Sequence, residues 1–273
     1  MNTLSRTWQL FKQSFTVLSE EPGLVVFPML TAGSALLLMA GFFVPLYRLG
    51  SLQAIVHRTA GWDDYVPLFS WYYANTFVVV FFNSALAACV NIRLSGGNPT
   101  LSDGLSVAAS RLPRIAAWTL VSATFGLLLR VIENHEKAGR FVTGILGAGW
   151  TLVTYLMIPV VIIEDRPVYK SVKRSIELLR NTWGEQLAGG FGFGLLGILL
   201  AIPGFGLGLI LIPVNLILGI SVIVTYVLML AAIFGAVRGI FTVALYRYAT
   251  DGNAPFGFSR DALGGPARPL AGY

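Results

Sequence analysis

The chain has 273 residues, of which 55% are apolar and only 12% are charged, about half the charged share of an ordinary soluble domain. A water-soluble globule of this size cannot bury so much apolar surface in one core, so the composition excludes a soluble enzyme. The single cysteine, Cys89, excludes an internal disulfide and a thiol-based metal or redox site. The net charge of +6 has to be judged against membrane topology before nucleic acid is considered.

Long uncharged segments predict an all-α integral membrane protein, because a membrane-spanning helix needs about 20 mostly apolar residues. We expect six such helices, arranged as three hairpins in one domain of residues 1–250. A flexible cytoplasmic tail is expected at 251–273. The predicted spans are about 24–47, 66–92, 112–132, 141–163, 187–211 and 216–247.

The boundary between the last two spans lies in a run of 52 uncharged residues, 186–237. At about 1.5 Å per residue this run is too long for a single crossing. Its clearest polar break is 212–215, where we expect a turn. A second break at Pro203 and Gly204 would instead kink the fifth helix or create a short re-entrant piece.

Basic residues are distributed unequally between the predicted loops. If the N-terminus is cytoplasmic, 13 of the 19 Lys and Arg residues fall on the inside and 5 in the outer loops. Because cytoplasmic loops are enriched in basic residues, we expect both termini in the cytoplasm. Anionic lipid of the inner leaflet then explains the basic excess, and no nucleic-acid partner is predicted.

Three segments that precede the odd-numbered spans share one apolar spacing, as in Trp8, Phe11, Phe15 and Leu18. Steps of three and four residues place such positions on one side of a helix. We therefore expect three amphipathic interfacial helices, each followed by a hairpin, as an internal repeat. The second copy departs from the others because Pro113 should end its helix early. The alternative is that any helix approaching a membrane shows this spacing.

Several short segments together resemble a known family. They are LVVFP at 24–28, FNSALAA at 82–88, NPTLSDG at 98–104, IEDRP at 163–167 and SVKRS at 171–175. They resemble an uncharacterised prokaryotic family of polytopic membrane proteins, a domain of unknown function. The layout is more distantly similar to the membrane domain fused to some glycerophosphodiester phosphodiesterases. The resemblance implies a six-span protein of the prokaryotic inner membrane and supplies no catalytic residue.

Polar residues inside the spans are the candidates for chemistry. Arg238 lies within the sixth span, where an unpaired charge costs several kcal/mol. Glu164 and Asp165, at the end of the fourth span, are candidate partners for it, so Arg238 is either a structural clamp or a substrate or ion site. Asn83 and Asn91 share one face of the second span, which favours helix packing and leaves a polar conduit as the alternative.

Glycines in the fifth span predict close helix packing. Residues 192–197 match GxGxxG, but they lie in an apolar helix without the acidic residue that ribose binding needs. The pairs Gly190 with Gly194 and Gly204 with Gly208 have the small-xxx-small spacing that lets helices approach. The outer loop sequence ENHE at 133–136 is read as a solvated loop rather than a metal site. No catalytic residue, metal or cofactor is predicted.

Three functions follow from these features. The first is a non-enzymatic module that organises membrane lipid or binds protein partners, including further copies of itself. The alternative is a small transporter or channel subunit with a polar intramembrane site around Asn83, Asn91 and Arg238. The third is a lipid-modifying enzyme with its site at the cytoplasmic surface around Glu164 and Asp165.

Overall fold

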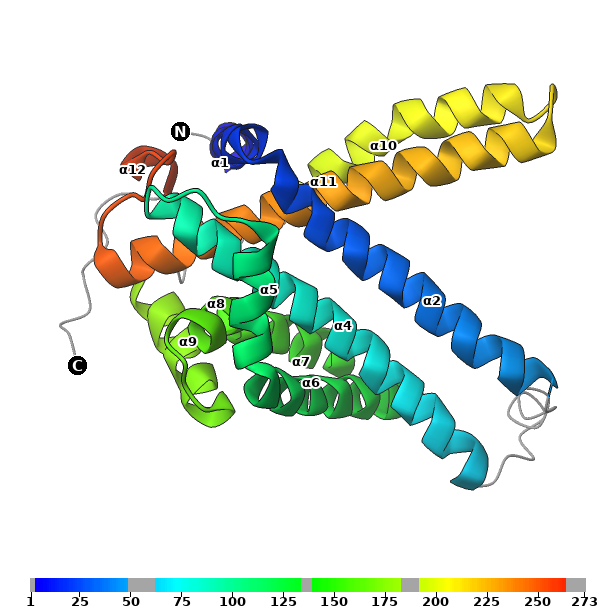
Figure 1. Cartoon of the computed structure of the whole chain (residues 1–273), viewed down its shortest axis with the longest axis horizontal. Coiled ribbons are helices and arrows are strands. Elements are labelled where there is room, and N and C mark those ends of the chain that lie inside the picture. Colours follow the sequence, from blue (N-terminus) through cyan, green and yellow to red (C-terminus); the bar gives the residue numbers. More distant parts are fainter. Residues whose placement is uncertain (1–2, 49–61, 134–138, 183–191, 264–273) are drawn as a thin grey trace.

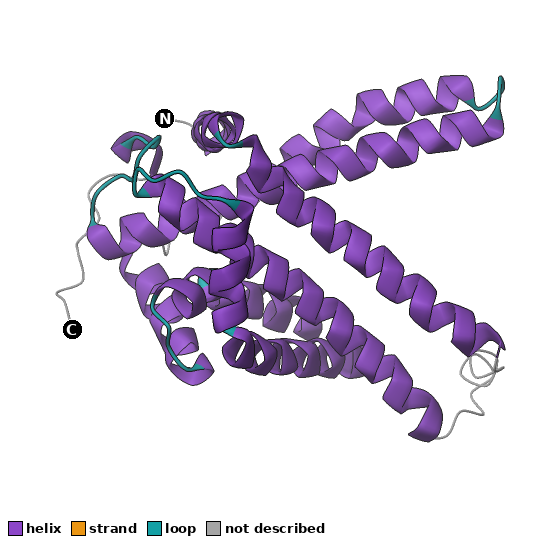
Figure 2. Ribbon diagram, in the orientation of Figure 1, coloured by secondary structure: helices purple, strands orange, loops and turns teal. Residues whose placement is uncertain are grey.

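The computed structural model describes residues 3–48, 62–133, 139–182 and 192–263 (Figure 1). Every secondary-structure element in these ranges is a helix (Figure 2). The elements are α1 (Thr3–Glu20), η1 (Pro22–Val25), α2 (Val26–Arg48), α4 (Trp62–Leu94), α5 (Leu101–Ser110), α6 (Leu112–Glu133), α7 (Gly139–Thr154), α8 (Met157–Ile163), α9 (Val168–Thr182), α10 (Gly192–Leu211), α11 (Leu216–Asp251) and α12 (Arg260–Leu263).

Five helical segments are long and apolar enough to cross a membrane, so the chain is a multi-pass membrane protein. They are Pro22–Val44, Val66–Leu94, Leu112–Leu129, Val142–Ile163 and Leu216–Asp251. Six spans were predicted. The predicted fifth span, 187–211, overlaps α10, whose apolar part Leu196–Leu211 is shorter than a full crossing. Residues 187–191 of that prediction lie outside the described residues.

The long helices pack in consecutive pairs: α2 on α4, α6 on α7, and α10 on α11. Figure 1 shows that the α10–α11 pair diverges strongly from the other helices, with its turn far out on one side. The helices α1, α5, α9 and α12 gather at the opposite end of the molecule (Figure 1).

The C-terminal half of α11 forms the centre of the core. At 36 residues this helix is about 54 Å long. Its first half packs on α10 and leaves large apolar side chains such as Ile217 and Met229 exposed. From Ala232 to Ala249 it is largely buried, and it contacts α1, α2, α4, α8 and α9. The core therefore lies toward the end where the short helices gather.

The turn between α10 and α11 lies where the sequence predicted it, at 212–215. Pro213 cannot donate a backbone hydrogen bond to continue α10. Asn215 starts α11, because its side-chain oxygen accepts a hydrogen bond from the backbone N–H of Leu218 at 3.0 Å. The alternative of a re-entrant break at Pro203 and Gly204 is not found, since α10 continues through both residues.

A proline also divides the second of the three predicted interfacial segments. Pro113 would remove a backbone hydrogen bond and clash with the preceding turn if the helix continued. The chain instead ends α5 at Ser110 and starts α6 at Leu112. The predicted apolar stripe is thus shared by two helices, and its members Ala108 and Ile115 are buried on either side of the break.

Residues 252–263 pack on α1, in the part of the chain where a flexible tail was predicted. Leu263 is fully buried, and the side-chain amide of Gln13 donates a hydrogen bond to the hydroxyl of Ser259 at 2.9 Å. Burial of apolar side chains on α1 offsets the entropy lost on ordering this segment. The remainder of the predicted tail, 264–273, lies outside the described residues.

Candidate functional site

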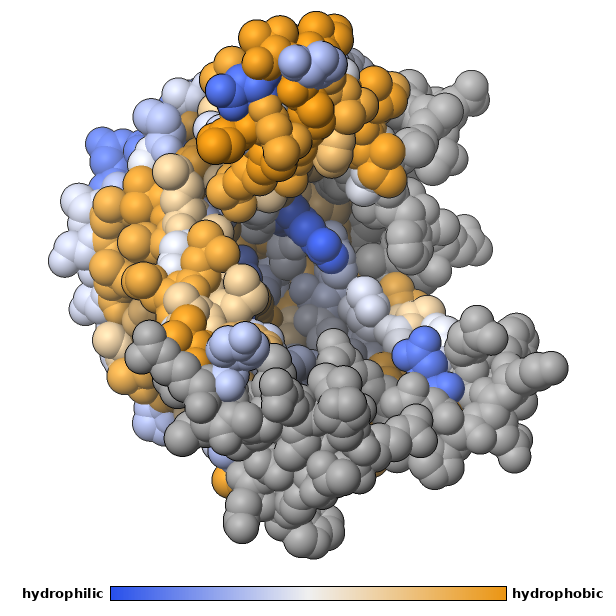
Figure 3. Space-filling view, turned by 90° about the vertical axis from the view of Figure 1, so that its right-hand side faces the viewer, coloured by the Kyte–Doolittle hydropathy of each residue, from blue (hydrophilic) through white to orange (hydrophobic). Residues whose placement is uncertain are grey.

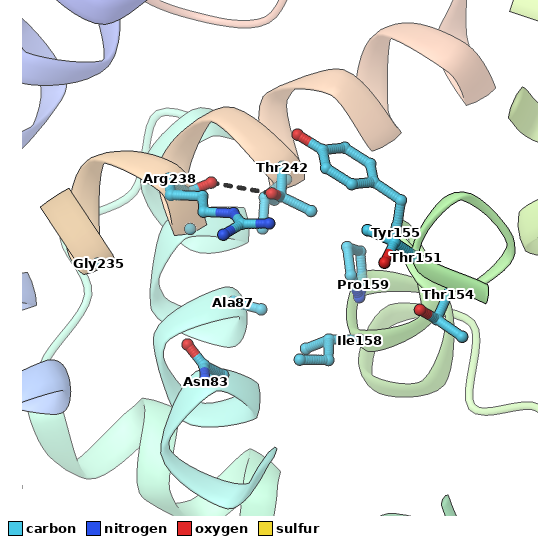
Figure 4. Close-up of a pocket in the computed structure, with 12 residues that line it drawn as sticks. Asn83, Ala87, Thr151, Thr154, Tyr155, Ile158, Pro159, Gly235, Arg238 and Thr242 are labelled. Carbon is cyan, nitrogen blue, oxygen red and sulfur yellow. Dashed lines mark hydrogen bonds between the residues drawn. The ribbon is translucent and has the colours of Figure 1, made fainter. Parts of the chain in front are cut away.

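A polar cavity of about 390 Å³ lies between α4, the α7–α8 segment and α11 (Figure 4). Its apolar walls come from residues such as Ile158, Pro159 and Val243. Polar side chains of three membrane-spanning segments line the rest of it. They are Asn83, Thr151, Thr154, Tyr155, Arg238 and Thr242.

Arg238 is the cationic residue of this cavity. It lies nine residues before Arg247, about 14 Å along α11 at the usual helical rise. Asn83 lies ten residues before Arg93 on α4, about 15 Å from that end. Arg93 and Arg247 both lie at the end of the molecule that carries α1, α5 and α9, so Asn83 and Arg238 have similar depths.

Two glycines flank Arg238 on α11 and let other helices approach. A Cβ at Gly239 would lie 2.5 Å from Leu86 Cδ2 on α4, and a Cβ at Gly235 would lie 3.3 Å from Pro28 on α2. Arg238 itself is exposed. The guanidinium therefore lies in an accessible hollow, while the backbone beside it is packed tightly.

The hydroxyl groups around Arg238 donate hydrogen bonds to their own helices. Thr242 donates to the carbonyl of Arg238 at 2.9 Å, Thr151 to Gly147 at 2.8 Å, and Thr154 to Trp150 at 2.8 Å. The Asn83 amide donates to Val79 in the same way, at 2.9 Å. The oxygens of these groups are left as acceptors facing the cavity, and Arg238 supplies positively charged donors.

A break in the fourth predicted span brings Thr154 and Tyr155 to the cavity. The sequence predicted one helix over 141–163, but residues 155 and 156 form a turn between α7 and α8. Pro159 accounts for the break, because it has no N–H to donate to the carbonyl of Tyr155 and its ring crowds that carbonyl. The ring of Tyr155 reaches from this turn toward α11 (Figure 4).

The predicted partners of Arg238 are engaged elsewhere. Among the ion pairs of the described residues, none joins Arg238 to an acidic side chain. Glu164 is bound by Arg166 Nε at 2.6 Å and Arg174 Nε at 3.2 Å. It also accepts a hydrogen bond from the hydroxyl of Tyr246 at 3.0 Å. Glu164 therefore ties α8 to α9 and α11 rather than neutralising the cavity.

Asp165 joins the α8–α9 turn to the α5–α6 junction. Its carboxylate is 2.8 Å from Arg111 Nε and also pairs with Arg114. Its backbone is left-handed, with φ 55°, a conformation that Asp tolerates better than most residues. Both carboxylates proposed for a surface enzyme site are thus held by arginines at helix junctions.

Asn91 does not line the cavity with Asn83. It lies at the core end of α4, where its backbone carbonyl accepts a hydrogen bond from Arg247 Nη1 at 3.3 Å. Eight residues turn a helix by about 80° beyond two full turns, so the face carrying Asn83 and Ala87 has rotated away by Asn91.

A second cavity, of about 610 Å³, adjoins the first between α10 and α11. Its walls include Ile198, Ala201 and Leu230. Arg238 and Gly235 line both cavities. Seen from the side of the hairpin turns, the molecule is hollowed below the hydrophobic α10–α11 pair, and hydrophilic surface lies inside the hollow (Figure 3).

The predicted packing glycines differ in their surroundings. A Cβ on Gly204 would overlap the ring of Tyr226, and one on Gly208 would overlap Ile223 and lie 3.0 Å from the carbonyl oxygen of Gly219. Among the described residues, none has an atom within 4 Å of such a Cβ on Gly194, apart from its own helix backbone and chain neighbours. Gly190 lies outside the described residues, as does most of the 133–136 loop considered for a metal.

Sequence reasoning selected Asn83 and Arg238 but missed the rest of the polar lining. The signals were present in the sequence. Thr242 lies four residues after Arg238 and therefore on the same helix face. Thr154 and Tyr155 precede Pro159 by five and four residues, which is where a proline disrupts the hydrogen bonding of a helix.

Comparison with known proteins identifies a family and no individual relative. Residues 63–256, more than two thirds of the chain, match the family described as "Family of unknown function (DUF6159)". No curated protein and no solved structure is significantly similar to the chain. The match supports the resemblance to an uncharacterised family. It gives no evidence for the more distant similarity to membrane domains of glycerophosphodiester phosphodiesterases. The chain belongs to the family of unknown function DUF6159.

Proposed function

We propose that this membrane protein is a small transporter or channel subunit that binds its ligand in the cavity around Arg238. One observation carries the proposal: an arginine and an asparagine from two different spans line one accessible cavity together with three threonines. A purely structural arginine would be expected to meet a carboxylate, and both nearby carboxylates are already paired with other arginines.

The cost of charge in a membrane supports this reading. An unpaired arginine deep in a spanning helix costs several kcal/mol on insertion scales, and such residues commonly mark substrate or ion pathways. A helix interrupted beside the site, as at Tyr155, is also a feature of transporter binding sites. An anionic or strongly polar ligand would offset the cost of placing Arg238 there.

The same proposal includes the six-span layout. In it, α10 forms a fifth span, so that three hairpins each follow an amphipathic interfacial segment and form an internal repeat. The end that carries α1, α5, α9 and α12 faces the cytoplasm at a prokaryotic inner membrane. The supporting observation is that residues 93–114, 166–180 and 247–260, which are rich in Lys and Arg, all lie at that end.

Flux measurements with reconstituted protein test the proposal. Vesicles containing the purified chain should release trapped organic anions faster than empty vesicles. Arg238→Leu should reduce this flux at least about tenfold, because a charged hydrogen bond contributes about 1.5–3 kcal/mol. Lys12→Leu, which removes an exposed cation of α1, is the matched control and should leave the flux unchanged. Equal flux through the wild type and Arg238→Leu would contradict the proposal.

A second candidate, a module that organises anionic lipid, is favoured by the surface of α9. Ser171, Ser175 and Leu178 are buried on one side of this helix. Lys170, Lys173 and Arg180 are exposed, and each basic residue near an anionic surface contributes about 1 kcal/mol.

Replacing the three basic residues of α9 by Gln tests this second candidate. Wild-type protein in mixed vesicles should enrich phosphatidylglycerol over phosphatidylcholine in its lipid shell, measured by energy transfer to labelled lipid. The triple variant should lose most of that enrichment. Unchanged enrichment would remove α9 as the lipid-organising surface.

A further inference from the structure

We infer that the ligand of the Arg238 site is an anionic amphiphile, with its head group in the polar cavity and its hydrocarbon chain in the adjoining cavity between α10 and α11. This inference rests on the proposed function and adds the chemical class of the ligand. The observation that supports it most directly is that Arg238 and Gly235 line both cavities.

The second cavity has the composition of a chain-binding groove. Apart from Arg238, its lining consists of glycines and apolar side chains, among them Ile198, Ala201, Leu230 and Phe234. Its volume of about 610 Å³ falls in the range of cavities that hold small ligands. Nothing along this lining other than Arg238 would hydrogen-bond a polar solute, so a hydrocarbon chain fits it and a hydrated ion does not.

The polar cavity has the donors and acceptors that an anionic head group needs. Arg238 is its cation, and guanidinium groups match the geometry of phosphate and carboxylate oxygens. The hydroxyls of Thr151 and Thr154 donate to their own helices, so their oxygens remain as acceptors. A phosphate monoester has both anionic oxygens and, when singly protonated, a hydroxyl donor. Such a group can therefore accept hydrogen bonds from Arg238 and donate one to a threonine oxygen.

The approach to the site also favours a ligand that comes from the membrane. The hairpin formed by α10 and α11 exposes large apolar side chains, including Ile198 at 68% and Leu199 at 60% of their surface. The hollow beside this hairpin (Figure 3) is bordered by surface that lipid chains cover. An amphiphile can move from the bilayer into the two cavities without leaving an apolar environment for its chain.

Three probes separate the contributions of the anion and the chain. They are dodecyl phosphate, inorganic phosphate, and the neutral monododecyl glycerol. Binding to the purified full chain in a neutral detergent is measured by native mass spectrometry, and folding is checked by thermal unfolding. We expect dodecyl phosphate to bind at least about tenfold more tightly than either other probe, since each lacks one of the two interactions.

Two variants with matched controls test the assignment of the cavities. Arg238→Leu should remove the preference for dodecyl phosphate over the neutral probe, whereas Lys12→Leu, at an exposed cation of α1, should keep it. Ala201→Phe fills the apolar cavity and should weaken dodecyl phosphate at least about tenfold while leaving inorganic phosphate unchanged. Leu209→Phe, on a lipid-exposed position of the same helix, is its control and should have no effect.

The outcomes distinguish the inference from the function on which it rests. If inorganic phosphate binds as tightly as dodecyl phosphate and Ala201→Phe has no effect, the ligand is a small anion and the inference is overturned while the site stands. If Arg238→Leu changes neither binding nor flux, the proposed function fails with it. If Lys12→Leu is as damaging as Arg238→Leu, the effect is one of surface charge and both are overturned.

Discussion

Asp165 combines an unusual backbone conformation with two ion pairs. Its left-handed φ of 55° would cost an alanine about 1–2 kcal/mol, whereas glycine adopts it freely. Asp165→Gly should therefore lose only the contacts with Arg111 and Arg114, about 1 kcal/mol for a half-exposed pair. Asp165→Ala should lose about 1 kcal/mol more. Thermal unfolding in detergent measures both, and equal Tm values for the two variants would mean that the backbone strain is absent.

Asp103 gives a pH dependence whose sign follows from its hydrogen bonds. Thr100 donates to the Asp103 carboxylate from its hydroxyl at 2.7 Å and from its backbone at 2.8 Å, which lowers the pKa of Asp103 from its usual 3.8. The folded state then binds fewer protons than the unfolded state. This stabilisation is complete above pH 3.8 and is lost as the pH falls through the lower folded value.

Asp103→Asn provides the measurement for this pH dependence. At neutral pH the variant should have the lower Tm, because an uncharged amide accepts these hydrogen bonds more weakly. As the solution is acidified below pH 3.8, the Tm difference between wild type and variant should shrink. If the Tm difference between wild type and Asp103→Asn stayed constant on acidification, the Asp103 carboxylate would not be the source of the pH dependence.

Residue types predicted the site only where a position inside a membrane span made them conspicuous. A charged residue in a span, such as Arg238, stands out because the membrane penalises it. Threonines do not stand out in this way. A threonine hydroxyl that donates to its own helix, as in Thr242, adds little to the free energy of inserting a span into the membrane. Asn91 was grouped with Asn83 on sequence spacing, and the accumulated helical rotation separates them.

At the scale of elements, the α10–α11 hairpin depends on close approach of its two helices at Gly204 and Gly208. Tyr226 packs on Gly204 and its hydroxyl donates to the carbonyl of Leu200 at 2.8 Å, so the ring cannot easily move aside. Gly204→Leu should cost about 1–3 kcal/mol by overpacking. Gly206→Leu is the matched control, because in the described part of the chain no other element has an atom within 4 Å of its Cβ position. Its Tm should stay equal or rise, as glycine is a poor helix former. Equal losses in both variants would contradict the packing role.

The helix boundaries followed from local rules where a single residue decided them. Pro113 and Pro213 ended helices as expected, since neither can donate a backbone hydrogen bond. The break before Pro159 was missed because the run around it is uniformly apolar, and hydropathy does not register a two-residue turn. Pro203 has the same chemistry but lies in a continuous helix, so the presence of a proline alone does not locate a break.

At the scale of the whole molecule, the divergence of the α10–α11 hairpin could not be read from the sequence. Apolar periodicity reports which residues avoid water, and in a membrane both lipid and protein satisfy that requirement. Long-range contacts such as Arg93 with Glu20 at 2.7 Å hold one end of the bundle together. The first half of α11 packs on α10 and leaves large apolar side chains exposed, so its sequence pattern does not report the direction of the hairpin.

Orientation is the remaining property of the whole molecule, and labelling of single cysteines tests it. Cys89 is buried, with 1% of its surface exposed, so it gives little background and Cys89→Ser removes the rest. Val214→Cys lies at the α10–α11 turn and Tyr169→Cys on α9, both at well-exposed positions. Because basic loops stay in the cytoplasm, an impermeant maleimide should label Val214→Cys in intact cells and Tyr169→Cys only after permeabilisation.

The reverse labelling pattern would mean that the protein has the opposite orientation in the membrane, with the Arg238 cavity nearer the outer leaflet. Labelling of both positions in intact cells would mean that the two ends do not lie on opposite sides of one membrane.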